Sequence, residues 1–167
     1  KMRRMYTAQS FEETAKKLKS TYPDFNLTTD VIVGFPGETE EDFLQTVEIA
    51  KRIGFGHIHT FKYSVRKGTR AERMPDQISE KVKTQRSEII RQLAEKMKLD
   101  YRKEFTGKIQ KVLVEKIDKD GFASGFGEHY IPIIIKQQGL ERNTFYNVEI
   151  TGYVLKDEPV LSAKLLE

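Results

Sequence analysis

The hydrophobic pattern of this chain changes at Gly107, and this change limits the folds that are open to it. Before Gly107, stretches with apolar residues at helical spacing alternate with short apolar runs. After it, five short apolar runs follow, and glycine or proline separates most of them. The pattern predicts an α/β part followed by an all-β part.

The α/β part begins with a predicted helix. Ser10 and Glu13 have the spacing of a capping box, which marks the start of a helix. The helix should end at Tyr22, because the residue before a proline, here Pro23, is pushed out of helical geometry.

A strand and a second helix are predicted next. Residues 27–33 are typical of a buried strand, and a turn at residues 34–37 closes it. Thr39 and Asp42 mark the start of the following helix, and Gly54 stands where a glycine commonly ends one.

A second strand over residues 57–63 completes the α/β part. Short connections between alternating helices and strands predict parallel strands that are covered by helices. Two parallel strands cannot complete a sheet, so we expect part of a larger α/β structure, truncated on its N-terminal side. The strand at residues 27–33 should then expose an unpaired edge, through which we expect the chain to self-associate.

One long helix is predicted over residues 79–105. We expect its charged face to be solvated, and the alternative is a stripe that faces RNA. Residues 106–167 then favour a small five-stranded antiparallel barrel. Its strands are predicted at residues 109–117, 122–126, 130–135, 145–153 and 160–166.

The chain contains no cysteine. Disulfides, thiolate zinc sites, thiolate-bound iron–sulfur clusters and cysteine nucleophiles are therefore excluded within these residues. No apolar run is long enough to span a bilayer, and the basic start is not followed by the apolar region of a signal peptide. We expect a cytoplasmic protein without a membrane partner.

The net charge of +4 is only a weak indication of phosphate binding. Residues 106–167 carry eight Lys and Arg side chains against nine Asp and Glu. This balance argues against strong phosphate binding by the predicted barrel alone.

The loop after the first strand is a candidate binding site, because ligands bind at the carboxyl ends of parallel strands. It precedes a helix N-terminus, whose free N–H groups can receive an anion. The alternative is an ordinary strand-to-helix turn that uses glycine and proline for its geometry. The loop consists of Gly34, Phe35, Pro36, Gly37 and Glu38.

The second candidate loop, residues 64–70, follows the second strand and should open onto the same face. Its Arg66 could pair with a carboxylate or a phosphate, and the alternative is a solvated surface loop. Within the strand, His57, His59 and Phe61 share one face by alternation. Two histidines without a third ligand nearby favour a packed or hydrogen-bonded pair over a zinc site.

Aromatic residues beside two glycines are the candidate RNA contacts of the predicted barrel, because exposed rings stack on bases. They can equally fill the core of the barrel. These residues are Phe122, Phe126, His129 and Tyr130.

Three motifs resemble those of the radical S-adenosylmethionine tRNA methylthiotransferases. Residues 2–7 are similar to the family's Met-x-Arg-x-Tyr-Thr segment. Residues 29–43, which include Gly-Phe-Pro-Gly-Glu-Thr, look like its most recognisable stretch in this half. Residues 63–69 resemble its Tyr-Ser-x-Arg-x-Gly-Thr motif, and the chain from about residue 107 resembles the TRAM module, a small RNA-binding β-barrel.

The resemblance implies three segments. Residues 1–78 would be the C-terminal part of an open, TIM-like radical S-adenosylmethionine barrel. Residues 79–105 would be a helix that closes this barrel and links it to the next segment, and residues 106–167 would be the TRAM barrel. The residues implied in S-adenosylmethionine binding are Gly34, Phe35, Pro36, Gly37, Glu38, His59, Phe61, Ser64 and Arg66. Those implied in RNA binding are Lys108, Lys111, Phe126, His129 and Tyr130.

The resemblance also implies an activity. Enzymes of the family use S-adenosylmethionine and two 4Fe–4S clusters to add a methylthio group to a modified adenosine beside the anticodon. The implied partner is therefore the anticodon stem-loop of tRNA. Met74, Gln77 and Ile78 resemble the branch that acts on threonylcarbamoyl-adenosine.

The family's cluster-binding cysteines have no counterpart in this chain. The resemblance therefore implies a fragment that is inactive by itself. Two alternatives remain, namely a non-catalytic RNA-binding module and a nucleotide-binding α/β domain unrelated to RNA.

Overall fold

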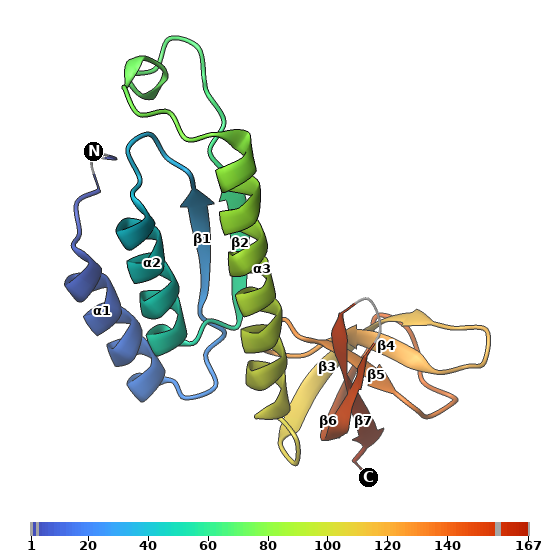
Figure 1. The fold of residues 1–167 in the computed structure, drawn as a ribbon. Helices are drawn as coiled ribbons and strands as arrows, with labels where there is room; N and C mark the ends of the chain where they lie inside the picture. Colours follow the sequence, from blue (N-terminus) through green and yellow to red (C-terminus); the bar gives the residue numbers. More distant parts are fainter. Residues whose placement is uncertain (1, 3, 156–157, 167) are drawn as a thin grey trace. The chain divides into compact units, whose positions relative to one another are not determined.

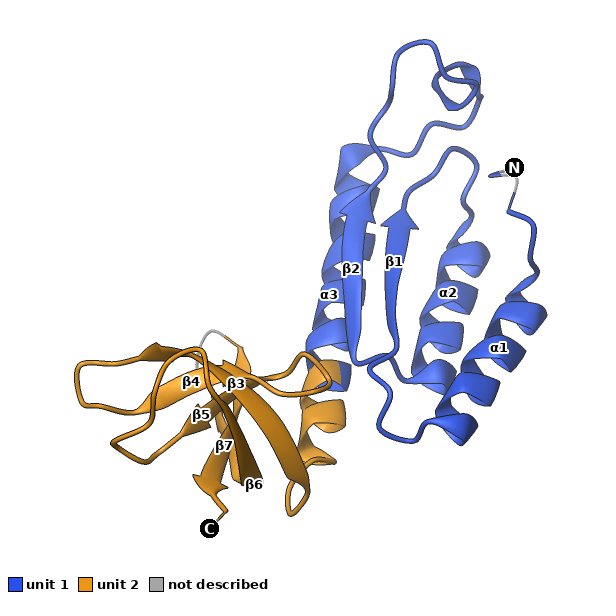
Figure 2. Cartoon of the chain, turned by 180° about the vertical axis from the view of Figure 1, so that it is seen from behind, with its two compact units in different colours: residues 1–97 blue, residues 98–167 orange. Residues whose placement is uncertain are grey.

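The computed structural model describes residues 2, 4–155 and 158–166. The chain forms two compact units, residues 1–97 and 98–167 (Figure 2). The elements before the barrel are α1 (Ala8–Thr21), β1 (Thr28–Val33), α2 (Glu40–Ile53), β2 (His57–Lys62), the 3-10 helix η1 (Ala71–Arg73) and α3 (Glu80–Lys103) (Figure 1). In the part of the chain that the structure describes, no helix is both long and apolar enough to cross a membrane.

The two strands of the first unit are parallel, as predicted. They pair in register from Thr28 with His57 to Val33 with Lys62. All three helices contribute buried side chains to one core, which also takes Val33 and Ile58 from the strands. The other face of the sheet stays open, since the paired residues Ile32 and Phe61 are 39% and 51% exposed.

No strand among the described residues pairs with the second edge of β1. This free edge is the one expected from the sequence. Self-association through it stays a prediction.

The start of α1 corrects the predicted capping box. The N-cap is Thr7, whose side chain accepts the Ser10 N–H, while the Ser10 hydroxyl accepts the Thr7 N–H. Glu13 instead accepts a hydrogen bond from Gln9 one helical turn earlier. Hydroxyl side chains thus occupy both positions of the capping box, Thr7 at the N-cap and Ser10 three residues later. The helix therefore begins one turn before the predicted start. The caps predicted for α2 are confirmed, with Thr39 at its start and a left-handed Gly54 at its end.

Glu12 of α1 ties this helix to α2. Its carboxylate lies 2.8 Å from Arg52 on α2 and 2.9 Å from Lys16 on its own helix. The hydrogen bonds from Arg52 and Lys16 lower the pKa of Glu12 to about 2.

Acid should therefore weaken the first unit through Glu12. A carboxyl with a lowered pKa stabilises the fold above its ordinary value of 4.5, and this stabilisation is lost as the pH falls toward 2. Urea unfolding of wild type and Glu12→Gln should differ more at pH 5 than at pH 2.5. Glu13→Gln, at a carboxylate that accepts from neutral Gln9, is the matched control. An equal difference at both pH values would contradict the assignment.

The second unit is a closed five-stranded barrel with the strand order β3-β4-β5-β7-β6. The strands are β3 (Ile109–Ile117), β4 (Ala123–Phe126), β5 (Pro132–Ile135), β6 (Phe145–Leu155) and β7 (Pro159–Leu165). The predicted antiparallel arrangement is corrected, because β5 and β7 run parallel. Five is an odd number, so strands that alternate in direction around a closed ring must leave one neighbouring pair parallel.

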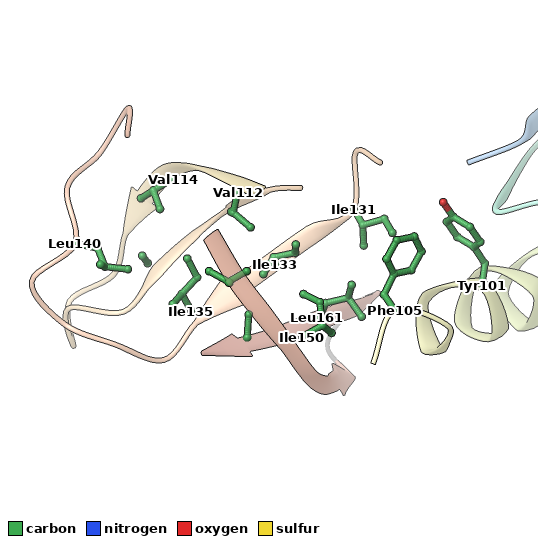
Figure 3. Close-up of a cluster of buried hydrophobic side chains, with 13 residues drawn as sticks. Tyr101, Phe105, Val112, Val114, Ile131, Ile133, Ile135, Leu140, Ile150 and Leu161 are labelled. Atoms are coloured by element: carbon green, nitrogen blue, oxygen red, sulfur yellow. The ribbon is translucent and has the colours of Figure 1, made fainter. Parts of the chain in front are cut away.

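The core of the barrel includes two aromatic residues that precede its first strand. Tyr101 and Phe105 are buried, and their rings meet edge to face at 5.2 Å. Figure 3 shows the Phe105 ring beside Ile131 within the cluster of barrel side chains. The boundary predicted near residue 105 stays a prediction, but the barrel core begins several residues before it.

The charged face of α3 is not uniformly solvated, which corrects the sequence prediction. Four of its cations are buried because each reaches a partner far along the chain or packs on a ring. In the second unit, Arg102 donates to the Pro159 carbonyl and lies 3.0 Å from Glu158, and Lys98 lies 4.0 Å from the same carboxylate. The four are Lys83, Arg86, Lys98 and Arg102.

Candidate functional site

The loops that follow β1 and β2 meet over the open face of the sheet. They border a cavity of about 340 Å³. Four of the predicted residues line this cavity, and its lining also includes Ile32 and Tyr63. The predicted residues are Phe35, Phe61, Ser64 and Arg66.

A second cavity, of about 610 Å³, adjoins the first along the loop that follows β1. It is lined by the predicted residues Pro36, Gly37 and Glu38, and it shares Met2, Ile32 and Phe35 with the first cavity. The structure therefore brings most of the two predicted loops to one place. Gly34 and His59 lie outside the lining of both cavities.

The two histidines of β2 contact each other, although His59 is exposed. The rings of His57 and His59 meet edge to face with their centroids 4.3 Å apart. No group of three or more side chains suited to hold a metal occurs in the described ranges.

Glu38 organises the first loop. One of its carboxylate oxygens accepts the Gly34 N–H at 2.7 Å and the Arg86 guanidinium at 2.6 Å. Arg86 also donates to the Glu38 carbonyl at 3.1 Å and to the Glu40 carboxylate at 3.0 Å. The Glu38 carboxylate therefore stabilises the conformation of the loop.

Arg86 is held in its charged form. Burial lowers the pKa of its guanidinium, but hydrogen bonds with Glu40 and Glu38 outweigh burial and raise the pKa above its ordinary value. The buried charge thus has two acidic partners, which is the condition under which such a charge is tolerated in a protein interior.

The two glycines of the loop are both needed by its geometry. Gly34 has a φ of 74°, and a Cβ there would lie 2.4 Å from Cγ of the buried Lys83. Gly37 has a φ of 76°, and its N–H donates to the Asp76 carbonyl at 2.9 Å. Contact with α3 and with the segment after η1 therefore fixes the path of the first loop.

The second loop is held by its own hydrogen bonds. The Thr69 hydroxyl donates to the Arg66 carbonyl at 2.7 Å, and the Gly68 N–H donates to Glu72 at 2.7 Å. Gln77 donates to the carbonyls of Ala71 and Met74, both at 3.0 Å. These bonds leave the Arg66 side chain exposed at the edge of the first cavity.

The cavities suit a ligand with an apolar part and an anionic part. In the smaller cavity, Phe35, Phe61 and Ile32 offer apolar surface, and the cations Lys62 and Arg66 belong to its lining. Because the chain has no cysteine, it supplies no thiolate for a redox centre.

The predicted RNA-binding residues fall into two groups. Lys108 and His129 pack on Phe105, with the Lys108 ammonium 5.1 Å and the His129 ring 5.0 Å from its centroid. Phe126 and Tyr130 stack on each other at 4.6 Å with an interplanar angle of 15°. The structure therefore does not unite the predicted set in a single cluster of contacts.

Lys111, the fifth residue of that set, lies over an aromatic ring that sequence reasoning missed. Its ammonium is 5.1 Å from the centroid of Phe145, which is 59% exposed. Phe145 could have been found as an outward position, because its strand alternates between exposed and buried residues. Lys83 and Arg86 were missed too, because helical periodicity alone does not show which charged residue meets a loop.

The fold is an α/β unit whose two loops border cavities, followed by a small closed β-barrel. No protein-family model matches the chain. It is 37% identical to a threonylcarbamoyladenosine tRNA methylthiotransferase of Thermotoga maritima, over 98% of this chain and 37% of that protein. It is 48% identical to a tRNA-2-methylthio-N(6)-dimethylallyladenosine synthase of Thermoanaerobacter sp., over 71% of this chain and 25% of the relative.

A Bacillus subtilis threonylcarbamoyladenosine tRNA methylthiotransferase matches over 81% of the chain at 35% identity. The chain is thus homologous to one segment of the tRNA methylthiotransferases, the family whose motifs it resembles. It spans about a third or less of the length of these relatives.

Proposed function

We propose that the chain forms the cofactor-pocket rim and the RNA-binding module of a tRNA methylthiotransferase. Residues 1–78 would be the C-terminal part of a radical S-adenosylmethionine barrel, residues 79–105 its closing and linking helix, and residues 106–167 a TRAM-like barrel. The observation that carries this proposal is the 37% identity to such an enzyme over 98% of the chain.

The two loops would bind S-adenosylmethionine. The apolar rim at Phe35 and Phe61 suits the adenine ring, and the exposed Arg66 suits the carboxylate of the methionine part. Gly37 allows backbone close to the ligand. When bound, S-adenosylmethionine would supply the methyl group and the radical chemistry, while these residues bind and orient it.

The iron–sulfur clusters do not fit this chain. It offers no cysteine, so both 4Fe–4S clusters of the proposed enzyme must be held by residues outside these 167. The chain by itself is accordingly expected to be inactive. A cytoplasmic location and the anticodon stem-loop as partner belong to the same proposal.

The proposal is tested on the full-length gene product, reconstituted without oxygen. We expect about eight irons per polypeptide, with matching sulfide, as two four-iron clusters require. Incubation with tRNA and S-adenosylmethionine should then give a methylthio-adenosine nucleoside by mass spectrometry. The 167-residue chain, treated in the same way, is the control and should contain no iron.

The product nucleoside also identifies the substrate. The relatives are of two kinds, which act on threonylcarbamoyl-adenosine and on dimethylallyl-adenosine. The nucleoside that gains the mass of a methylthio group shows to which of the two kinds the enzyme belongs. A well-folded full-length protein without iron would contradict the proposed enzyme.

A non-catalytic RNA-binding module is the second candidate. The exposed aromatic residues of the barrel favour it over a domain unrelated to RNA. It predicts RNA affinity in a full-length protein that holds no iron.

A further inference from the structure

A row of apolar side chains crosses the outer face of three barrel strands. Along β3, Gln110, Val112 and Val114 are buried, so the alternate residues point outward. Leu113 is one of these outward residues. It pairs with Phe126 of β4 on one side and with Phe145 of β6 on the other. The three side chains are therefore neighbours on the outside of the barrel.

Tyr130 extends this row. Its ring stacks on Phe126 nearly in parallel, yet 77% of the residue is exposed. One face of the tyrosine ring is thus covered by Phe126, while most of its remaining surface faces solvent. The row consists of three aromatic residues, Tyr130, Phe126 and Phe145, with Leu113 between the two phenylalanines. We call it the aromatic row.

The backbone holds Tyr130 in an unfavourable conformation. Its φ is 57°, in the left-handed region that side chains with a Cβ rarely adopt. A tight turn imposes it, in which the Tyr130 N–H donates to the Gly127 carbonyl at 2.9 Å and the Gly127 N–H donates to the Ile131 carbonyl at 3.0 Å. Such outliers point toward a functional role for the displayed side chain.

The charges around the aromatic row nearly cancel. Lys111 lies over Phe145, and Glu128 accepts the Lys111 backbone N–H at 3.2 Å. Further along the same face, Glu149 and Lys164 form a 2.9 Å ion pair. A partner that binds here would be recognised by ring contacts more than by attraction between charges.

We propose that the aromatic row is a stacking site for unpaired RNA bases, with Lys111 as its single phosphate contact. Every base has a flat face that stacks on an exposed ring, whereas bases inside a duplex do not expose theirs. This inference rests on the proposed function, because it names which part of a tRNA the barrel binds: nucleotides of a loop rather than the paired stem.

The test uses the 167-residue chain and two fluorescent RNA probes. One probe is a hairpin with an unpaired loop, and the other is the duplex of its stem alone. Anisotropy should show tighter binding of the hairpin. In Tyr130→Asn the ring is lost, while asparagine still tolerates the left-handed backbone at this position. This variant should bind the hairpin about 5- to 150-fold more weakly, the range expected for loss of one base stack. Tyr130→Phe keeps the ring and should bind the hairpin as tightly as wild type.

Salt dependence separates stacking from charge. With one lysine contact to single-stranded RNA, the slope of log K against log salt should be near −0.7. It should stay the same in Tyr130→Asn and approach zero in Lys111→Met. Tyr153→Asn, at another partly exposed tyrosine of the barrel, is the matched control and should bind as wild type.

Wild-type hairpin affinity in Tyr130→Asn, or equal affinity for hairpin and duplex, would overturn the stacking site. So would a steep salt slope that Tyr130→Asn leaves unchanged together with the affinity. Unchanged circular dichroism and melting temperature verify that the variants are folded. If the full-length protein holds iron and modifies tRNA while Tyr130→Asn binds normally, only this inference fails. If Tyr130 is needed for binding but iron is absent, the enzyme proposal fails and the stacking site stands.

Discussion

Replacing Arg86 with methionine should destabilise the first unit by about 3 to 5 kcal/mol, the usual cost of breaking a buried ion pair. Methionine keeps much of the bulk that packs over Phe43, where the guanidinium lies 5.3 Å from the ring centroid. It removes the hydrogen bonds to Glu38 and Glu40, however. The Glu38 side chain is only 13% exposed, so its carboxylate would lose its positive partner inside the protein.

The effect should concentrate in the loop that follows β1. Glu38 also accepts the Gly34 N–H, so hydrogen exchange at Gly34 should accelerate in Arg86→Met more than exchange in the barrel strands. In the full-length protein, we expect the loosened loop to weaken S-adenosylmethionine binding. Arg86→Lys should recover only part of the stability, because one ammonium cannot reproduce the paired donors of a guanidinium.

Arg91→Met is the matched control on the same helix, since Arg91 is exposed. Urea unfolding, followed with a probe in each unit, is the measurement, because a chain with two units need not unfold in one step. If Arg91→Met and Arg86→Met shift the first-unit midpoint equally, the buried ion network does not stabilise the loop.

Replacing Phe105 with alanine should destabilise the barrel by about 3 to 5 kcal/mol, as is typical of a fully buried phenylalanine. Phe105 has no exposed surface, and its ring contacts Tyr101, His129 and the Lys108 ammonium. Loss of the ring would leave a cavity that the closed barrel, already packed with isoleucine and valine, cannot fill by collapse.

The midpoint of the second unit should therefore fall, while that of the first unit stays the same. Phe145→Ala is the control, because Phe145 is 59% exposed and its loss should cost less than about 1 kcal/mol. Equal shifts in the two variants would mean that Phe105 is not part of the barrel core.

Local signals in the sequence were sufficient for most of the elements. The parallel strands, the caps at Thr39 and Gly54 and the five barrel strands were predicted from residues that lie close to one another in the chain. The capping box of α1 was misplaced because Thr7, Ser10 and Glu13 offer two alternative starts at the same spacing.

The parallel pair in the barrel was missed for a different reason. Each hairpin of the sequence indicates only that consecutive strands can be antiparallel. The pairing of β5 with β7 arises when the ring closes, and β6 lies between these strands in the chain. Closure is a property of all five strands together.

The sequence by itself determined the order of helices and strands, the absence of cysteine and the motifs shared with the methylthiotransferases. Helical or strand periodicity and capping are set by neighbours a few residues apart, so the chain displays them directly. Only the tertiary structure decided which charges of α3 are buried and that the rings of Phe126 and Tyr130 stack on each other. The acidic partners of Arg86 are 46 and 48 residues away, and that of Arg102 is 56 residues away. Contacts over such separations depend on how whole elements pack, and no local pattern encodes them.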